Sequence, residues 1–277
     1  MTRRRLLLIG LVLLFTTGGL YWMNLRRPIA PTVIYQGVTY GCEELEVDNQ
    51  RRGLVHWVSI DLTAPGIELY VTPLDPQAVA QGWQFRLQRT GAVVKEERLA
   101  VGINATYFSS DSAWIAMPGD FARAAEATVA DYCPSHIPEH TYLLCFDEHA
   151  APSFETARPP KDSVLRRTRW GLGGRGAVLL MHGQIFQDTP KEPMDARTAV
   201  GFNAEKRLLF MAAFEKASPR AALEKLAALG ASDGMLLDGG SSTSMALGGE
   251  ARGVRSGVLM GGWRPVATHF GVRARAL

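Results

Sequence analysis

The stretch MLLDGGSSTSMAL, residues 235–247, places one acid where an apolar run stops and a cluster of glycines and hydroxyls begins. The acid is Asp238, and the residues after it are Gly239, Gly240, Ser241, Ser242, Thr243 and Ser244. An acid at a strand end projects into a cleft, and glycines let the backbone approach a ligand because they carry no Cβ. Hydroxyls and freed backbone N–H groups can bind a sugar or a phosphoryl oxygen. A capped turn, in which Asp238 accepts from backbone N–H groups, explains this segment alone equally well.

Two further segments place a polar residue at the end or start of an apolar strand. GINATYF, residues 102–108, ends a strand at Asn104 and continues into aromatics, a combination suited to the hydroxyls and ring face of a sugar. DARTAVGF, residues 195–202, places Arg197 before a strand, and a guanidinium fork matches phosphate oxygens. The three segments together predict a site built at several strand ends.

These segments resemble, in order along the chain, the motifs of the phosphodiester glycosidase family. INATYF is similar to the family's I-N-G-G-F-F-like strand end, ARTAVGF to its P-R-T-A-I-G-like strand, and LLDGGSSTSM to its L-D-G-G-G-S-S/T-T-M segment. SPRAALEKLAALGASDGM before the last motif and RPVATHFGV after it also fall in the family's order, so the resemblance covers residues 54–273. The chain departs from the pattern where Ala105 and Thr106 replace paired glycines and Ser241 replaces a third glycine.

The resemblance implies a bacterial envelope enzyme that hydrolyses a sugar-1-phosphodiester on an envelope or extracellular glycan, releasing free sugar and a phosphomonoester. It implies that Asp238 acts at the anomeric carbon, that Arg197 neutralises the phosphate and that Asn104 orients the sugar. The substrate-binding residues that it implies are Ser242, Thr243, Gly239, Gly240, Tyr107 and Arg264. No cofactor or metal ligand is implied, and a divalent cation stays an open alternative.

Most glycosidases use two carboxylates, and their separation sets the stereochemical outcome. Besides Asp238, four acids lie near a strand end or a matched motif: Asp61, Asp111, Asp195 and Glu215. The sequence does not choose among them.

Other functions were weighed against this one. A serine hydrolase would need a base such as His269 to approach one of the serines through folding. GLGGRG, residues 171–176, fits the G-x-G-x-x-G spacing but leads into a strand, which favours a flexible glycine loop over a dinucleotide site. A non-catalytic glycan-binding or structural envelope protein, tethered to the membrane, is the alternative function.

The first 27 residues form a separate segment. Its apolar run, residues 6–23, lies between arginine clusters and is about long enough to cross a bilayer with its more positive end in the cytoplasm. No convincing cleavage site follows, which favours an uncleaved, single-pass signal anchor in the inner membrane, with the domain facing the periplasm or cell exterior. The expected partners are the membrane, through residues 6–23, and a carbohydrate phosphodiester substrate.

The charge balance excludes one class of partner. Residues 1–27 hold five arginines and no acid, so removing them from the formal charge of +3 leaves −2 for the remainder. The basic character therefore belongs to the anchor, and no nucleic acid is expected as a partner.

Three cysteines permit two interpretations. In an oxidising compartment, Cys133 and Cys145 are spaced to close a short disulfide loop, which leaves Cys42 unpaired. A small zinc site that adds His136 and His140 is the alternative.

The remaining pattern predicts an α+β fold, a strand-rich mixed sheet domain with few helices, preceded by one transmembrane helix. Residues 28–53 are expected to be a linker and lead-in, and residues 54–277 one phosphodiester glycosidase-like domain. A helix is expected between Ser218 as its cap and Gly230 as its stop. Residues 105–170 lack periodicity, which favours long loops of the kind that line a site, with disorder or an extra subdomain as the alternative. Strands are expected at 54–62, 67–72, 98–104, 177–186, 197–203, 207–214 and 265–272, the first two joined by a tight turn.

Overall fold

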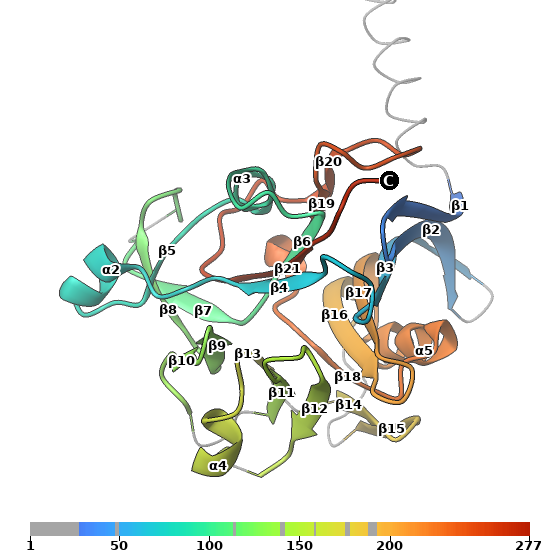
Figure 1. Ribbon diagram of the computed structural model, residues 1–277. Coiled ribbons are helices and arrows are strands. Elements are labelled where there is room, and N and C mark those ends of the chain that lie inside the picture. The colour runs from blue at the N-terminus through green and yellow to red at the C-terminus, as the bar shows by residue number, and fades with distance from the viewer. Residues whose placement is uncertain are drawn as a thin grey trace, which may run out of the picture.

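Antiparallel strand pairing builds most of the chain. The computed structural model describes residues 28–47, 50–112, 115–138, 142–157, 159–174, 178–187 and 193–277. Within these residues the strands form four sheets with few helices beside them (Figure 1), and every strand pairing is antiparallel. The predicted strand-rich fold with few helices is confirmed.

The largest sheet places strands from residues 29–61 beside strands from residues 178–236. Its eight strands lie in the order β1 (Ile29–Tyr35), β2 (Val38–Val47), β3 (Gln50–Asp61), β17 (Leu208–Ala217), β16 (Asp195–Asn203), β18 (Asp233–Leu236), β14 (Val178–Met181) and β15 (Gln184–Gln187). Helix α5 (Pro219–Leu229) lies against this sheet (Figure 1) and buries Leu223 and Leu226 with Phe210 and Phe214. This contact fixes one face of the sheet.

Helix α5 begins and ends where the sequence predicts. The hydroxyl of Ser218 accepts a hydrogen bond from the Ala221 N–H at 3.1 Å, which satisfies one of the unpaired donors of the first turn. Pro219 takes the first helical position, where no N–H is needed. Gly230 ends the helix with a φ of 110°, a backbone conformation that favours glycine.

A second sheet packs on the other face of the largest one. Its order is β20 (Gly257–Gly261), β19 (Ser244–Leu247), β6 (Val101–Asn104), β21 (His269–Arg273) and β4 (Glu68–Val71). Ile103 and Phe270 of this sheet share the main core with Val200 and Met211 of the largest sheet. Helix α3 (Thr90–Glu96) covers its outer face with Val93 and Val94.

Two smaller sheets complete the domain. One is a five-stranded sheet in the order β10 (Cys133–Pro134), β9 (Thr128–Ala130), β13 (Trp170–Gly174), β11 (Tyr142–Phe146) and β12 (Pro152–Glu155). The other has three strands in the order β5 (Phe85–Arg86), β8 (Phe121–Ala124) and β7 (Phe108–Ser110). The short helices α2 (Pro76–Ala80) and α4 (Asp162–Leu165) lie in the connections.

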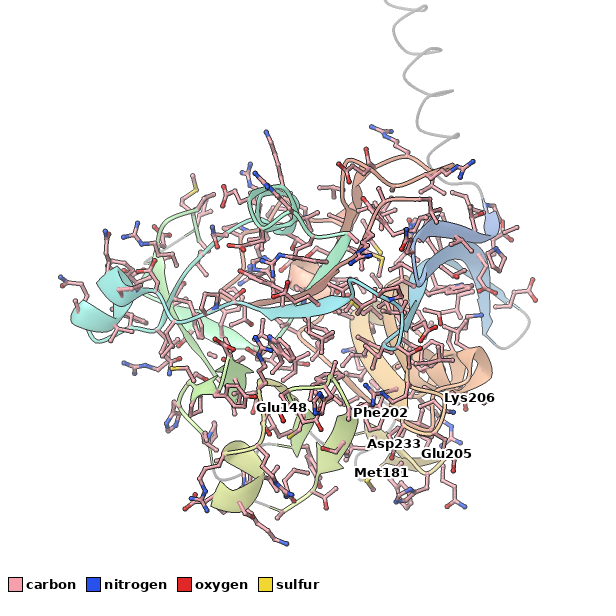
Figure 2. All side chains as sticks on the ribbon, viewed as in Figure 1. Glu148, Met181, Phe202, Glu205, Lys206 and Asp233 are labelled. Atoms are coloured by element: carbon pink, nitrogen blue, oxygen red, sulfur yellow. The ribbon has the colours of Figure 1, made fainter. Side chains whose placement is uncertain are left out.

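The turn between β16 and β17, in the largest sheet, contacts the sheet that contains β11. Figure 2 shows Glu205 and Lys206 on this turn and Glu148 on the turn between β11 and β12. The two turns are in contact because the Arg207 guanidinium donates to the carbonyl oxygen of His149 at 2.5 Å. This contact restrains the end of β16 at the turn. Arg197 lies near the other end of the same strand.

The linker prediction for residues 28–53 is wrong. These residues form β1, β2 and the start of β3, and Ile34, Val38 and Tyr40 are buried in the core. Pro31 is a residue type that is rare inside sheets. Here it lies on an edge strand, between Ile29 and Thr32, where the register of the β1–β2 pairing shifts.

The two strands at 54–62 and 67–72 exist, but they do not pair with each other. β3 pairs with β2 and β17 in the largest sheet, whereas β4 pairs with β21 in the second sheet. The turn between them is a passage from one sheet to another. Local alternation predicts a strand but carries no information about which sheet it joins.

The long loops predicted for 105–170 are also a wrong assignment for much of that range. The described part contains six short strands, β7 to β12, and helix α4. GLGGRG does not open as a loop either, because Gly171 to Gly174 lie in β13. A Cβ on Gly171 would come within 3.1 Å of the Val129 side chain, so glycine allows close strand packing there. Residues 175–177 lie outside the described residues.

The disulfide prediction is wrong, because all three cysteines are free. Cys133 is on β10 and Cys145 is on β11, and β9 and β13 lie between those strands. Three strand spacings place β10 and β11 roughly 14 Å apart, too far for a disulfide between their cysteines. The zinc alternative needs both thiols together and also His140, which lies outside the described residues. In the described residues no three His, Cys, Asp or Glu side chains gather as a metal site.

The predicted membrane anchor, residues 1–27, lies outside the described residues. From residue 28 onward, the part of the chain that the structure describes holds no helix long and apolar enough to span a bilayer.

Candidate functional site

The segment of residues 235–247 connects two sheets. β18 ends at Leu236 in the largest sheet, a short 3-10 turn η1 (Gly240–Ser242) follows, and β19 begins at Ser244 in the second sheet. Asp238 stands at the head of this crossover. Its N–H donates to the carbonyl oxygen of Ala105 at 2.9 Å, and its own carbonyl accepts from the Asn104 amide at 2.7 Å. The end of β6 therefore holds the crossover on both sides of the Asp238 backbone.

Asn104 is fully buried and binds three segments at once. Its Oδ1 accepts from the Thr198 hydroxyl at 2.6 Å and from the Ser244 N–H at 3.0 Å, while its Nδ2 binds the Asp238 carbonyl. It thus joins the ends of β6, β16 and β19. The sequence predicts that Asn104 orients a sugar, and its bonds to three chain segments give it a positioning role at the crossover.

Arg197 lies next to the crossover. The Leu237 N–H donates to the Thr198 carbonyl at 2.9 Å, and continuing this pairing by one residue puts Arg197 beside Asp238. The Arg197 guanidinium donates to the Pro193 carbonyl at 2.9 Å through Nη2. A Cβ on Gly239 would lie only 3.0 Å from the Ala196 carbonyl oxygen and 3.7 Å from Arg197 Nη1. Glycine at 239 therefore lets the turn approach the arginine.

Two of the four candidate second carboxylates lie at this turn. Gly240 has a φ of 58°, and a Cβ there would lie 3.4 Å from Asp195 Oδ2, so Asp195 stands against the turn. Glu215, at the end of β17, accepts from the Leu54 N–H at 3.0 Å and lines a cavity together with Gly240.

The other two candidates have different places. Asp61 lies at the far end of β3, opposite Leu208, and its carboxylate accepts from the N–H and hydroxyl of Thr63 in a turn. Asp111 is exposed, and its N–H donates to the Phe121 carbonyl beside the three-stranded sheet. Their contacts agree with turn and surface roles.

Arg264 ties the hydroxyl run to the aromatic stretch after β6. Its Nη1 donates to the Ser241 hydroxyl at 2.6 Å, and its Cζ lies 5.4 Å from the centre of the Phe108 ring. Tyr107, which precedes Phe108 in the chain, is half-buried, and its carbonyl accepts from the Ala125 N–H at 2.7 Å. The serine that departs from the family pattern is thus the residue that holds Arg264.

The hydroxyls of the run have different environments. Ser242 and Thr243 are buried. The Thr243 hydroxyl is shielded from solvent and has no hydrogen-bond partner in the described residues, which is costly by about 1–3 kcal/mol. The residue Thr243 also lines a cavity of 450 Å³ beside the turn.

Comparison with known proteins identifies the family. The family described as phosphodiester glycosidase matches residues 97–273, more than half of the chain. The chain belongs to the phosphodiester glycosidase family. A search of curated proteins finds no match.

Two solved structures share the fold. One is the catalytic domain of zebrafish N-acetylglucosamine-1-phosphodiester α-N-acetylglucosaminidase, auto-inhibited by its pro-peptide, at 13% identity and a TM-score of 0.62 over 90% of this chain and 87% of that one. The other is a hypothetical protein from Synechocystis, at 15% identity and a TM-score of 0.63 over 86% of this chain. The matched part is 62% of the Synechocystis chain.

The serine-hydrolase alternative finds no support in this phosphodiester glycosidase. His269 is buried, and its backbone N–H donates to the Thr72 hydroxyl at 2.8 Å. Burial lowers the pKa of its imidazole to about 3. The hydroxyls of Ser241 and Ser244 bind Arg264 and Thr90 instead. No described hydrogen bond joins His269 to a serine of the run.

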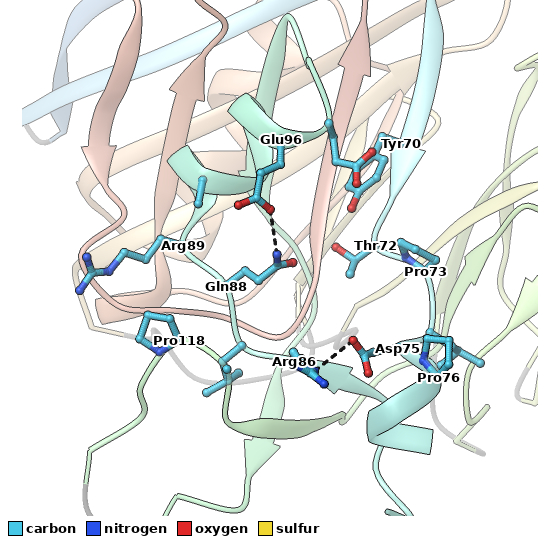
Figure 3. A pocket seen from close by; sticks show the side chains of 15 residues that line it. Tyr70, Thr72, Pro73, Asp75, Pro76, Arg86, Gln88, Arg89, Glu96 and Pro118 are labelled. Atoms are coloured by element: carbon cyan, nitrogen blue, oxygen red, sulfur yellow. Dashed lines mark hydrogen bonds and ion pairs between the residues drawn. The ribbon is translucent and has the colours of Figure 1, made fainter. Parts of the chain in front are cut away.

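A larger cavity of 680 Å³ lies away from these residues (Figure 3). In the close view, Arg86 pairs with Asp75 at 3.2 Å and Gln88 donates to Glu96 at 3.2 Å. The predicted site residues are not among those that line it in the described chain. The crossover, which gathers the predicted site residues, is therefore the stronger candidate site.

Sequence reasoning missed the residues that hold the site together. Thr198 and Ser244 bind Asn104, and the Thr268 hydroxyl accepts from the Thr106 N–H at 3.0 Å. Thr198 and Ser244 stand inside the quoted motifs, directly after Arg197 and at the end of the hydroxyl run. Their place in the motifs was the available signal.

Proposed function

We propose that this phosphodiester glycosidase hydrolyses a sugar-1-phosphodiester on an envelope or extracellular glycan and releases free sugar and a phosphomonoester. The observation that carries the proposal is that Arg197 lies against Gly239, the residue after Asp238, at a turn whose glycines allow this close approach. Membership of the family supports a glycosidase-type enzyme, and the shared fold with the zebrafish glycosidase is consistent with it.

Arg197 and Asp238 would divide the chemistry between them. Carbonyl contacts to Pro193 and Ala217 hold the guanidinium, which binds the phosphate and stabilises it as a leaving anion. Because a phosphomonoester is a good leaving group, the C–O bond breaks without a strong general acid. Asp238 acts at the anomeric carbon, where positive charge develops as that bond breaks.

The second carboxylate of the reaction is assigned to Asp195 in this proposal. Asp195 Oδ2 stands against Gly240, and one of its oxygens accepts from the Ala196 N–H at 2.8 Å. Glu215 also has one oxygen engaged, by the Leu54 N–H at 3.0 Å, and it lines the neighbouring cavity. Asp195 is assigned because its Oδ2 lies against the turn that follows Asp238, with Asn104 holding that turn.

The proposed setting is the outer face of the inner membrane. Residues 6–23 would anchor the chain as a single-pass helix, and the domain from residue 28 would face the periplasm or the cell exterior. The apolar run and its flanking arginines support this orientation.

The test is the release of free sugar from a panel of sugar-1-phosphodiesters by a protein that comprises residues 28–277. Asp238→Asn and Arg197→Lys are expected to lower kcat by on the order of 10²–10³, since each removes a charge or a fork made for the reacting group. Asp195→Asn is expected to cost more than Glu215→Gln. Glu205→Gln, on the distant turn of Figure 2, is the control and should leave turnover unchanged.

Full turnover by a correctly folded Asp238→Asn protein would remove Asp238 from the mechanism. Binding of these compounds without release of sugar by the unmodified protein would instead support the non-catalytic alternative.

A further inference from the structure

The cavity beside the crossover turn is separate from the reacting groups but shares a wall with them. Gly240 and Ser241 of η1 line it, together with Thr243 and with Glu215 and Lys216 from the end of β17. Asp238 and Arg197 are not among its lining residues in the described chain. A group bound in this cavity would therefore lie next to the reacting unit of a substrate, on the other side of the η1 backbone.

One wall of the cavity is an aromatic side chain that the fold leaves in solvent. Trp263 lines the cavity with 68% of its surface exposed, whereas Trp57 and Trp170 are only 8% and 7% exposed. Exposure of so large an apolar side chain is unfavourable unless a ligand covers it. Its flat ring offers the kind of surface on which a sugar ring packs.

The position of Trp263 is fixed by the chain before it. Gly261 and Gly262 have φ values of 56° and 75°, a backbone conformation that favours glycine. A Cβ on Gly261 would overlap the carbonyl oxygen of Thr243, so glycine alone lets this segment lie directly on the hydroxyl run. Trp263 and Thr243 thus line the same cavity.

The polar groups of the cavity select a neutral, hydroxyl-rich ligand. Glu215 places a carboxylate in the wall and would repel a phosphate, but it accepts hydrogen bonds from sugar hydroxyls. Lys216 adds a donor. A volume of 450 Å³ lies in the range of small-ligand sites.

We propose that this cavity, the Trp263 subsite, binds a neutral pyranose ring adjacent to the sugar-1-phosphate unit of the substrate. The ring packs on Trp263, and its hydroxyls bind Glu215 and Lys216. This inference rests on the proposed hydrolytic function for its meaning but not for its test. It predicts that the substrate is a glycan of at least two rings, not an isolated sugar phosphodiester.

The first experiment measures binding without turnover. Neutral tetrasaccharides of N-acetylglucosamine, glucose and mannose are titrated by calorimetry into the protein of residues 28–277 and into its Asp238→Asn variant. At least one tetrasaccharide is expected to bind both proteins equally. Trp263→Ala should weaken that binding at least 10-fold and Trp263→Phe less than 3-fold. Tyr132→Ala, which removes another exposed aromatic, is the matched control.

The second experiment compares the methyl phosphodiester of the preferred sugar 1-phosphate with the same compound extended by one neutral sugar on either side. The extended compound is expected to have a kcat/KM about 10-fold higher, and Trp263→Ala should bring the ratio close to one. If no tetrasaccharide binds, or Trp263→Ala binds as well as the unmodified protein, the subsite is disproved. Tetrasaccharide binding that depends on Trp263, without hydrolysis of any diester, would keep the subsite and reject the proposed function.

Discussion

At the scale of single residues, Asn104 carries the structure of the site. It is fully buried and satisfies the Thr198 hydroxyl, the Ser244 N–H and the Asp238 carbonyl. Asn104→Ala leaves these groups buried without partners, and we expect the free energy of unfolding to fall by about 2–4 kcal/mol. Urea unfolding, followed by circular dichroism, measures this loss. Thr198→Val removes only one of the bonds and should cost about 1 kcal/mol.

A positioning role for Asn104 has a second consequence. At a temperature where the Asn104→Ala protein is still folded, its kcat should fall, because the turn that carries Asp238 loses its anchor on β6. Unchanged kcat in that folded variant would show that the Ala105 carbonyl bond to Asp238 suffices to hold the turn.

At the scale of elements, the crossover turn depends on the backbone conformation of Gly240. Its φ of 58° is strained for any residue with a Cβ, so Gly240→Ala should lower the free energy of unfolding by about 1 kcal/mol. The added methyl group would also lie in van der Waals contact with Asp195 Oδ2, at 3.4 Å, so relief of the backbone strain would shift the turn relative to that acid. We therefore expect turnover to fall about 10-fold, measured by release of free sugar.

The chain offers a matched control for this prediction. Gly183, in the turn between β14 and β15, has a φ of 77°, and a Cβ there would have no atom within 4 Å. Gly183→Ala should cost a similar amount of stability without changing turnover. Equal turnover in the Gly240→Ala and Gly183→Ala proteins would mean that the Gly240 position matters for folding alone.

The same elements show how far local sequence pattern can predict this fold. The helix at Pro219–Leu229 and the strands near Val58, Val200 and Met211 follow from capping signals and apolar alternation. The pairing of Val58 with Met211 could not be predicted in this way, because the two residues are far apart in sequence and pair only in the folded sheet. Short strands such as β13, with three glycines, lack the alternation that identifies a strand.

The site was predictable to a similar depth. The motifs place Asn104, Arg197 and Asp238 at strand ends, and the structure brings all three to one crossover. The choice among four candidate carboxylates needed the fold, because closeness to η1 depends on which strand ends meet there. Trp263 carries no local signal, since exposure is decided by the whole surface.

At the scale of the whole molecule, two buried histidines predict the acid limit of stability. Burial lowers the pKa of His56 to about 4 and that of His269 to about 3, so both are neutral in the folded protein near pH 5. The unfolded chain binds protons at its ordinary histidine pKa of about 6.5, so stability is lost as the pH falls below that value. Each histidine should contribute on the order of 1 kcal/mol per pH unit down to about pH 4.

Urea unfolding at pH 7, 6 and 5 measures this dependence. His56→Gln should reduce the slope of stability against pH, whereas His149→Gln should not, because His149 is exposed. An unchanged slope in the His56→Gln protein would mean that His56 is protonated in the folded state, against the direction of its lowered pKa.

The first two strands decide where the domain begins. A protein of residues 28–277 keeps β1 and β2, whereas one of residues 54–277 loses them together with the start of β3. The shorter protein lacks the buried side chains of Ile34, Val38 and Tyr40. Loss of each costs about 2–5 kcal/mol, and the sum reaches the 5–15 kcal/mol that stabilises a typical domain. It also exposes β3 as a long unpaired edge.

We therefore expect the protein of residues 28–277 to be monodisperse, to unfold cooperatively on heating and to resist proteolysis. The protein of residues 54–277 should aggregate or be digested, because His56 also loses the Tyr40 hydroxyl, 2.8 Å away, as the partner of its buried imidazole. Size-exclusion chromatography and limited proteolysis distinguish the two outcomes. If the shorter protein unfolds cooperatively, β1 and β2 are an addition to a core that folds from residue 54, and the edge of the sheet lies at β3.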